Sequence, residues 1–241
     1  MDEPSWKKGV AELVGTFTLI YVGVLVLVGG FGSKGDLVAI ALAHGFAIAV
    51  MVSATMSISG GQLNPAVTTG LLIGRKITPA QAGINILMQL VGGILGGYLA
   101  KASLGGADIT GGVPDLGAFP GGAAVTVGTG ILIEAILTFF LVFVVFGTGV
   151  DARFGARIGG LAIGLTVALD IMAGGPLTGG AMNPARWVGA AIPAMHFNNA
   201  LVYIVGPLAG AIAAGLLYTT VLEGPRPHPE PAVQMRAKDN P

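Results

Sequence analysis

Two asparagine side chains are the clearest candidates for chemistry in this sequence. Residues 59–66 read SGGQLNPA and residues 178–185 read TGGAMNPA, so the same turn recurs 119 residues further along. An asparagine amide offers an acceptor oxygen and two N–H donors. Asparagine also suits the N-cap of a helix, and proline suits the first helical position, where its missing N–H costs nothing. The pattern therefore predicts two helices that begin at these turns. Their motif residues are Asn64, Pro65 and Ala66, and Asn183, Pro184 and Ala185.

Both predicted helices are short. The first spans Pro65–Ile73 and is stopped by Gly74-Arg75-Lys76, and the second spans Pro184–Ile192 and is stopped by Pro193. At 1.5 Å per residue, such a helix is about 14 Å long, roughly half a bilayer. Two surface loops with ordinary caps would be the alternative. The repetition favours re-entrant half-helices that enter a membrane from opposite faces.

Such half-helices would direct their N-termini at the centre of the membrane. Each N-terminus carries about half a positive elementary charge, which disfavours cations. The amides of Asn64 and Asn183 would donate hydrogen bonds to a passing oxygen, so that a file of water molecules there could not relay protons. Arg186 lies one helical turn after Asn183, on the same side of the half-helix. An arginine at this depth is costly unless it lines a wet cavity. We therefore expect it in a pore, with a salt bridge to a loop acid as the alternative.

Composition shows which elements must position these groups. The 241 residues are 53% hydrophobic and only 10% charged, with 41 glycines and no cysteine. So little charge cannot cover the surface of a soluble domain of this size, and small residues allow membrane helices to approach closely. We expect an all-α membrane protein surrounded by lipid. Disulfides and cysteine-bound metals are excluded, and the formal net charge of zero indicates no nucleic-acid partner.

Long apolar stretches identify the membrane spans. A bilayer core of about 30 Å requires roughly 20 apolar helical residues. Long continuous runs favour helices over the alternating strands of a barrel. Six stretches qualify: Val10–Val28, Leu37–Ser57, Pro79–Ala100, Thr126–Gly147, Ile158–Met172 (extended at either end) and Ala200–Leu222.

The basic residues orient these spans, because cytoplasmic loops are enriched in Lys and Arg. Both termini are predicted to be cytoplasmic, since this places nine basic residues inside and three outside. The inside set is Lys7, Lys8, Arg75, Lys76, Arg153, Arg157, Arg226, Arg236 and Lys238, and the outside set is Lys34, Lys101 and Arg186. We expect the cell membrane (the inner membrane in a prokaryote), with a vacuolar membrane as the alternative.

The chain divides into two repeats. Glu12, Thr16 and Phe17 recur as Glu134, Thr138 and Phe139, displaced by 122 residues. Three spans per repeat force opposite orientations of the two halves, so the sequence predicts an inverted 3+3 repeat. Residues 1–222 would form one channel domain, with repeats at about 8–101 and 127–222 and an outer connecting loop at 102–126. The proline-rich, polar residues 223–241 predict a disordered cytoplasmic tail.

At these motifs the sequence resembles the aquaporin (major intrinsic protein) family, from the Glu12 region to Gly206-Pro207. The resemblance implies six membrane helices plus two half-helices, and a homotetramer with one pore per subunit. It implies no cofactor. It also implies that Glu12 and Glu134 brace the re-entrant loops by accepting backbone hydrogen bonds.

The resemblance further implies a selectivity filter of His44, Ile171, Gly180 and Arg186. This set, with the text AHGFAIAV around His44, is similar to tonoplast-type aquaporins. Ile171 and the small Gly180 imply a wide filter with one apolar wall. Such filters admit water and also ammonia, sometimes urea or peroxide. Trp187 follows the arginine where glycerol channels typically carry aspartate, so a glycerol facilitator is the less favoured reading. The outer loop has no histidine, which weakens the case for ammonia.

Asp170 and Trp187 depart from the pattern of relatives. We expect Asp170 to face a neighbouring subunit, a loop or the pore mouth, and Trp187 to pack against the outer vestibule or anchor at the membrane interface. Neither a nucleophile–base pair nor a metal cluster nor a phosphate loop is evident, so a passive channel is favoured over an enzyme. The alternatives are an ion-coupled inverted-repeat transporter and, less favoured, an adhesive junction protein with closed pores.

Overall fold

The computed structural model describes residues 3–30, 36–151 and 158–223. Six of its helices are long and apolar enough to cross a membrane, which confirms the predicted all-α fold class. They are α1 (Ser5–Val28), α2 (Leu37–Ser59), α4 (Pro79–Ser103), α5 (Val127–Val145), α6 (Gly159–Thr178) and α8 (Ala200–Leu217). The last residues of the fourth and sixth spans are π-helical turns, η2 (Phe146–Val150) and η3 (Tyr218–Leu222). Of the predicted tail, only Glu223 belongs to the described residues.

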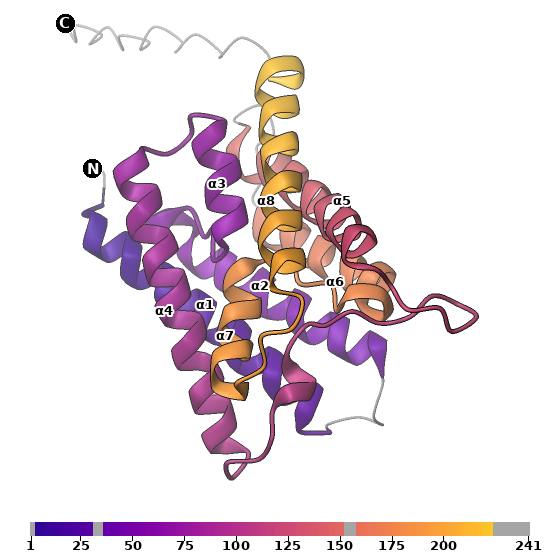
Figure 1. Cartoon of the computed structure of the whole chain (residues 1–241). Coiled ribbons are helices and arrows are strands. Elements are labelled where there is room, and N and C mark those ends of the chain that lie inside the picture. Colours follow the sequence, from indigo (N-terminus) through magenta and orange to yellow (C-terminus); the bar gives the residue numbers. More distant parts are fainter. Residues whose placement is uncertain (1–2, 31–35, 152–157, 224–241) are drawn as a thin grey trace, which may run out of the picture.

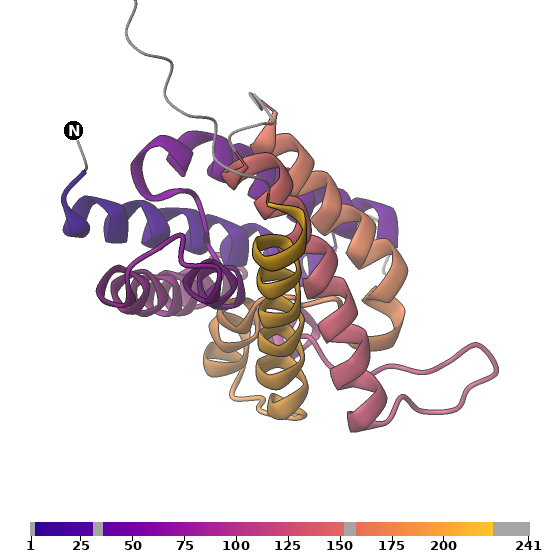
Figure 2. The same ribbon diagram turned by 90° about the horizontal axis from the view of Figure 1, so that it is seen from above.

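Two short helices complete the bundle. Helix α3 (Pro65–Ile73) follows the first Asn–Pro–Ala turn, and α7 (Pro184–Ala194) follows the second. They lie end to end within the bundle, with α4 and α8 beside them (Figure 1). Viewed from above, α1 lies on one side of the bundle and α5 and α6 on the other, with α8 between them (Figure 2). The predicted end of the second short helix was two residues early, because Pro193 lies inside its last turn.

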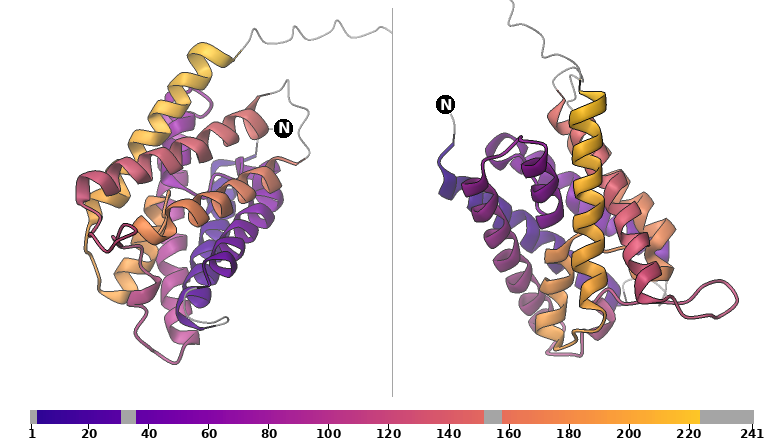
Figure 3. Two further views of the ribbon diagram at one scale, coloured as in Figure 1. Left: turned by 90° about the vertical axis from the view of Figure 1, so that its right-hand side faces the viewer. Right: turned by 45° about the horizontal axis from the view of Figure 1, so that its top comes forward.

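The two halves of the chain pack in the same way. Helix α1 packs on α4 and α2 in the first half, and α5 packs on α8 and α6 in the second. Each short helix packs on a long helix of the other half, α3 on α8 and α7 on α4. The start of α1 and the end of η3 lie at the same end of the bundle (Figures 1 and 3).

Small residues hold the two halves together where α2 crosses α6. A Cβ added to Gly45 would lie 2.6 Å from the carbonyl oxygen of Gly164, and one added to Gly164 would lie 2.3 Å from that of Gly45. The backbones are therefore in direct contact. Lipid supplies no hydrophobic force between helices, so this close packing is what drives their association.

The fifth span is longer than its predicted core. It continues from Met172 through Pro176 to Thr178 and ends at Gly179, whose φ of 80° is left-handed. A proline normally interrupts a helix. Here the outer loop packs on this end of α6, and the N–H of Gly117 donates to the carbonyl of Leu177 at 2.9 Å. Tertiary contact thus compensates for the local cost.

Candidate functional site: a central pore

The two Asn–Pro–Ala turns meet at the centre of the molecule. Asn64 caps α3 by accepting a hydrogen bond from the N–H of Ala66 at 2.8 Å, and Asn183 caps α7 by accepting from the N–H of Ala185 at 2.9 Å. Both capping residues are extended, with φ of −160° and −149°. Each cap uses the side-chain oxygen, so the amide nitrogen of each asparagine remains available.

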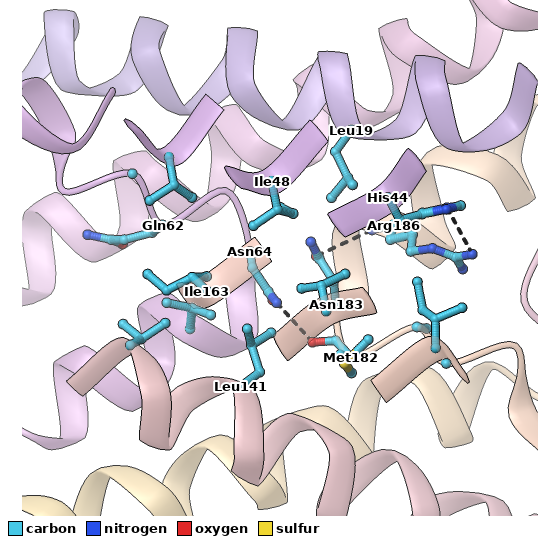
Figure 4. A pocket seen from close by; sticks show the side chains of 18 residues that line it. Leu19, His44, Ile48, Gln62, Asn64, Leu141, Ile163, Met182, Asn183 and Arg186 are labelled. Atoms are coloured by element: carbon cyan, nitrogen blue, oxygen red, sulfur yellow. Dashed lines mark hydrogen bonds between the residues drawn. The ribbon is translucent and has the colours of Figure 1, made fainter. Parts of the chain in front are cut away.

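Each amide nitrogen also binds the opposite turn. Asn64 Nδ2 donates to the carbonyl of Met182 at 2.9 Å, and Asn183 Nδ2 donates to the carbonyl of Leu63 at 3.0 Å. The amides were expected to donate to a passing oxygen, and each already donates one hydrogen within the protein. One hydrogen of each amide joins the two loops, and one remains for a solute. Both side chains line the central cavity (Figure 4).

Left-handed residues shape the two turns. Leu63 and Met182, which precede the asparagines, have φ of 52° and 53°. This conformation costs roughly 1 kcal/mol or more in a residue with a side chain. It persists because the surroundings hold it, and both carbonyls are hydrogen-bonded across the centre.

A buried carboxylate lies behind each turn. Glu134 on α5 accepts hydrogen bonds from Thr178 Oγ1 at 2.7 Å, from the N–H of Ala181 at 2.9 Å and from the N–H of Met182 at 2.7 Å. Glu12 on α1 makes the same contacts in the first half. It accepts from Ser59 Oγ at 2.6 Å and from the N–H groups of Gln62 and Leu63 at 2.9 and 2.6 Å. Both glutamates are fully buried, so every one of these bonds is shielded from water.

Glu12 has one partner that Glu134 lacks. Gln89 on α4 donates to Glu12 at 2.7 Å and to Thr68 Oγ1 at 3.0 Å. Sequence reasoning missed Gln89, although an amide within an apolar span was a usable signal. In the second half, the residue related to Thr68 by the 119-residue shift is Trp187.

The prediction for Trp187 was wrong. Its ring is 5% exposed and stacks on Tyr203 of α8, with ring centroids 6.0 Å apart. Tyr203 in turn donates from its hydroxyl to the carbonyl of Thr178 at 2.9 Å. Trp187 therefore packs inside the second half, behind the turn, and contributes to neither the vestibule nor the membrane interface.

Asp170 is also buried within the subunit, at 1% exposure. This burial contradicts the expectation that it faces a neighbouring subunit, and Asp170 does not line the central cavity. Its Oδ2 atom has no hydrogen-bond partner in the described part of the chain.

The structure brings the four expected filter residues to one cavity. His44 (α2), Ile171 (α6), Gly180 and Arg186 (α7) all line it, together with Asn64 and Asn183. Gly180 has a φ of 55°, and a Cβ there would lie 3.3 Å from the Cα of Ile171. Glycine at this position therefore adopts a left-handed conformation without strain, and it has no side chain that would narrow the cavity.

His44 and Arg186 contact each other. His44 Nδ1 lies 2.8 Å from the carbonyl of Ile40, and Nε2 lies 3.3 Å from Arg186 Nη2. A carbonyl only accepts and a guanidinium only donates. The ring must therefore carry its proton on Nδ1 and accept from Arg186 through Nε2. Both ring nitrogens are then occupied, so the ring serves as a wall of the cavity.

Arg186 keeps donors that no protein group satisfies. Its Nε and Nη1 atoms are buried and have no hydrogen-bond partner among the described residues. The salt bridge to a loop acid, considered above as an alternative, does not occur between described residues, where the contact of this side chain is with His44. Unpaired buried donors are costly, and no described residue offsets that cost here.

Away from Arg186 the cavity is lined mainly by apolar side chains, with Gln62 as a polar residue among them (Figure 4). Sequence reasoning did not assign these wall residues, although the spacing of Ile163, Val167 and Ile171 on α6 is a helical stripe that could have indicated them. The apolar wall residues are Leu19, Ile48, Val52, Val67, Leu141, Val145, Ile163 and Val167.

A second cavity adjoins Arg186 on the side of the outer loop, and Asp115 lines it. Asp115 Oδ2 accepts from His196 Nε2 at 2.8 Å, and Oδ1 accepts from Asn199 Nδ2 at 2.6 Å and from the N–H of Leu116 at 2.9 Å. Burial alone would raise the pKa of Asp115, but these hydrogen bonds outweigh it and hold the pKa below its ordinary value. They tie the outer loop to the residues that follow α7.

A pore through a bundle of six spans defines the class: the protein is an integral membrane channel. The sequence profile of the major intrinsic protein family matches residues 2–218, and the chain belongs to this family. The chain is 38% identical over 226 residues to the probable aquaporin TIP2-2 of Oryza sativa subsp. japonica, covering 90% of this chain and 88% of the relative. It is 39% identical over 233 residues to aquaporin TIP2-1 of Arabidopsis thaliana, covering 93% and 90%.

The fold is shared with a solved structure. The aquaglyceroporin from Plasmodium falciparum superposes with a TM-score of 0.77, covering 90% of this chain and 97% of that one, at 23% identity. This identity is too low to carry an argument about solutes.

Proposed function

We propose that the chain is a passive channel that conducts water and ammonia, with urea and peroxide as further small neutral solutes, and excludes protons and ions. The observation that carries this proposal is the arrangement of Asn64 and Asn183. Each amide has one hydrogen bound across the centre and one left for the cavity, at the N-terminus of a half-helix. A water oxygen that accepts from both amides has its own hydrogens directed away along the file, which interrupts proton transfer.

Cation exclusion has a second cause at the filter. Arg186 adds a fixed positive charge to the half-helix N-termini, and the wall opposite the polar groups is apolar. An ion would lose its hydration shell there and gain few replacement ligands. We expect the guanidinium of Arg186, which lines the cavity, to donate to small neutral molecules.

The width of the filter favours the passage of neutral solutes other than water. Ile171 and Gly180 supply only apolar or backbone surface, and both nitrogens of His44 are already bonded. Ammonia is similar in size to water and needs a single donor or acceptor, so it suits this filter. Glycerol would need several hydroxyl partners at once.

We further propose a homotetramer with one pore per subunit and both termini in the cytoplasm. The tetramer rests on family membership. The orientation rests on the distribution of basic residues. Arg153, Arg157, Arg226, Arg236 and Lys238, and Lys34 on the opposite side, lie outside the described residues.

The test is stopped-flow light scattering on proteoliposomes with water, ammonia, urea and glycerol gradients. Wild type should be more permeable to water and ammonia than empty vesicles, with a low activation energy and no dependence on a coupling ion. His44→Phe should reduce ammonia or urea flux more than water flux, because a larger apolar ring narrows the filter. His196→Gln, which lies outside the central cavity, is the matched control. Wild-type permeability equal to that of empty vesicles would refute the channel, and ion-coupled, saturable flux would favour a transporter.

A further inference from the structure

Gly23 on α1 lies directly against the ring of His44. A Cβ added to Gly23 would lie 2.5 Å from His44 Nε2, 3.1 Å from Cδ2 and 3.2 Å from Cε1. Carbon atoms prefer separations of about 3.5 Å or more, so a methyl group here would have to displace the ring by about 1 Å.

The side of the ring that faces Gly23 is the side away from the pore. A small separate cavity between α1 and α7 is lined by Gly23, His44 and Arg186, whereas Gly23 does not line the central cavity. His44 and Arg186 therefore separate the two spaces. A group added at Gly23 pushes the ring toward the lumen.

The inverted repeat supports the same conclusion. The 122-residue shift that relates Glu12 to Glu134 places Val145 opposite Gly23, and the 119-residue shift places Ile163 opposite His44. Val145 and Ile163 both line the central cavity. In the first half, by contrast, the bulky residue of the pair is His44 on α2. The corresponding position on α1 is Gly23, which has no side chain.

The geometry points to Gly23 as a specificity-determining residue of the filter: by leaving room for the His44 ring outside the lumen, it sets how wide the filter is for neutral solutes larger than water. This inference rests on the proposed function, since it presupposes that His44 lines a conducting filter. The residue acts through His44 and is a positioning residue.

The experiment is a double-mutant cycle of Gly23→Ala and His44→Ala in proteoliposomes, with water, ammonia and urea as probes. Gly23→Ala should lower the urea-to-water permeability ratio on the order of tenfold, as expected when one methyl group narrows a pocket. If the wild-type channel is impermeable to urea, the ammonia-to-water permeability ratio is measured instead. If it conducts only water, the water permeability itself is the measured quantity. In the His44→Ala background the same substitution should change the readout less than about twofold. Gly83→Ala on α4, where a Cβ would meet nothing within 4 Å, is the control for a methyl group on a membrane helix.

The outcomes separate the two claims. A wild type no more permeable than empty vesicles refutes the proposed function. A conducting wild type with an unchanged Gly23→Ala variant overturns only the role of Gly23, and so does an equal loss in both backgrounds. If Gly23→Ala alone is not recovered from membranes, the double variant must be recovered at the level of His44→Ala, because the clash is then removed. Loss of the double variant as well would overturn the inference.

Discussion

Replacing Glu134 by glutamine should loosen the second re-entrant turn without changing the size of the side chain. The carboxylate accepts from two backbone N–H groups and one hydroxyl, with Thr178 and Ala181 on Oε1 and Met182 on Oε2. A glutamine amide presents one oxygen and one NH₂ group. If the NH₂ takes the place of Oε2, it opposes the N–H of Met182. If it takes the place of Oε1, the Thr178 hydroxyl can turn to accept, but the NH₂ opposes the N–H of Ala181. Either orientation leaves one buried N–H without an acceptor.

The magnitude follows from that single group. A buried, unsatisfied N–H costs about 1–3 kcal/mol. For a chain of this length, each kcal/mol lowers the melting temperature by about 2–4 °C, so a decrease of about 2–12 °C is expected. Water permeability should fall as well, because the carbonyl of Met182 that binds Asn64 belongs to the same turn.

The assay is thermal unfolding of the purified protein in detergent, followed by water permeability of proteoliposomes. Glu12→Gln should behave alike, since its oxygens meet the N–H groups of Gln62 and Leu63. Glu3→Gln is the matched control, because the partner of Glu3 among the described residues is Lys7, in an exposed ion pair at 3.1 Å. A Glu134→Gln variant with the stability and permeability of wild type would show that the carboxylate does not hold the turn.

Three further predictions concern packing and the outer face. Gly97→Ala should prevent folding, because a Cβ there would lie 1.9 Å from the carbonyl oxygen of Gly189 on α7; a monodisperse, heat-stable variant on size-exclusion chromatography would contradict this. The pKa of Asp115 is depressed in the folded state, so its hydrogen bonds should stabilise the outer loop above its ordinary pKa of 3.8 and be lost as the pH falls below that value. The protection factors of residues 107–126, which correct hydrogen exchange for its intrinsic pH dependence, should therefore fall at acidic pH in wild type but be low at every pH in Asp115→Ala, and pH-independent protection in wild type would refute the linkage. Lys101 donates from Nζ to the carbonyl of Pro193 at 2.8 Å, at the end of α7, so Lys101→Met should cost about 1 kcal/mol in thermal unfolding, whereas Lys101→Arg should retain most of that stability.

The fold was predictable because its signals are long or repeated. Six apolar runs and two identical capping turns each rest on many residues, so local exceptions do not alter the result. The end of α6 shows where this reasoning stops. Pro176 would end a helix on local rules, yet the helix continues, since Gly117 from a distant loop binds its last turn. Such a contact has no trace in the sequence near Pro176.

The sequence predicted which residues form the site, but it did not predict all of their hydrogen bonds. The spacing of the motifs identified the two asparagines, and the family resemblance supplied the residues now found around one cavity. Neither signal could show that each asparagine donates one amide hydrogen to the opposite turn. These two hydrogen bonds join residues that are 118 and 120 positions apart in the sequence. Trp187 was misplaced for a similar reason. Its position depends on Tyr203 of another helix, and hydrophobicity alone does not distinguish a buried indole from an interfacial one.

The repeat explains how the two ends of the cavity differ. The 119-residue shift pairs His44 with Ile163, Val52 with Ile171, Gly61 with Gly180 and Val67 with Arg186. All eight residues line the central cavity. The end of the cavity remote from Arg186 therefore uses the same four backbone positions as the filter, with apolar side chains in place of histidine and arginine. Arg186 can donate hydrogen bonds to a solute, and His44 binds Arg186 and forms the wall beside it. Selectivity is thus concentrated at His44 and Arg186, while the two turns between the ends serve solutes arriving from either side.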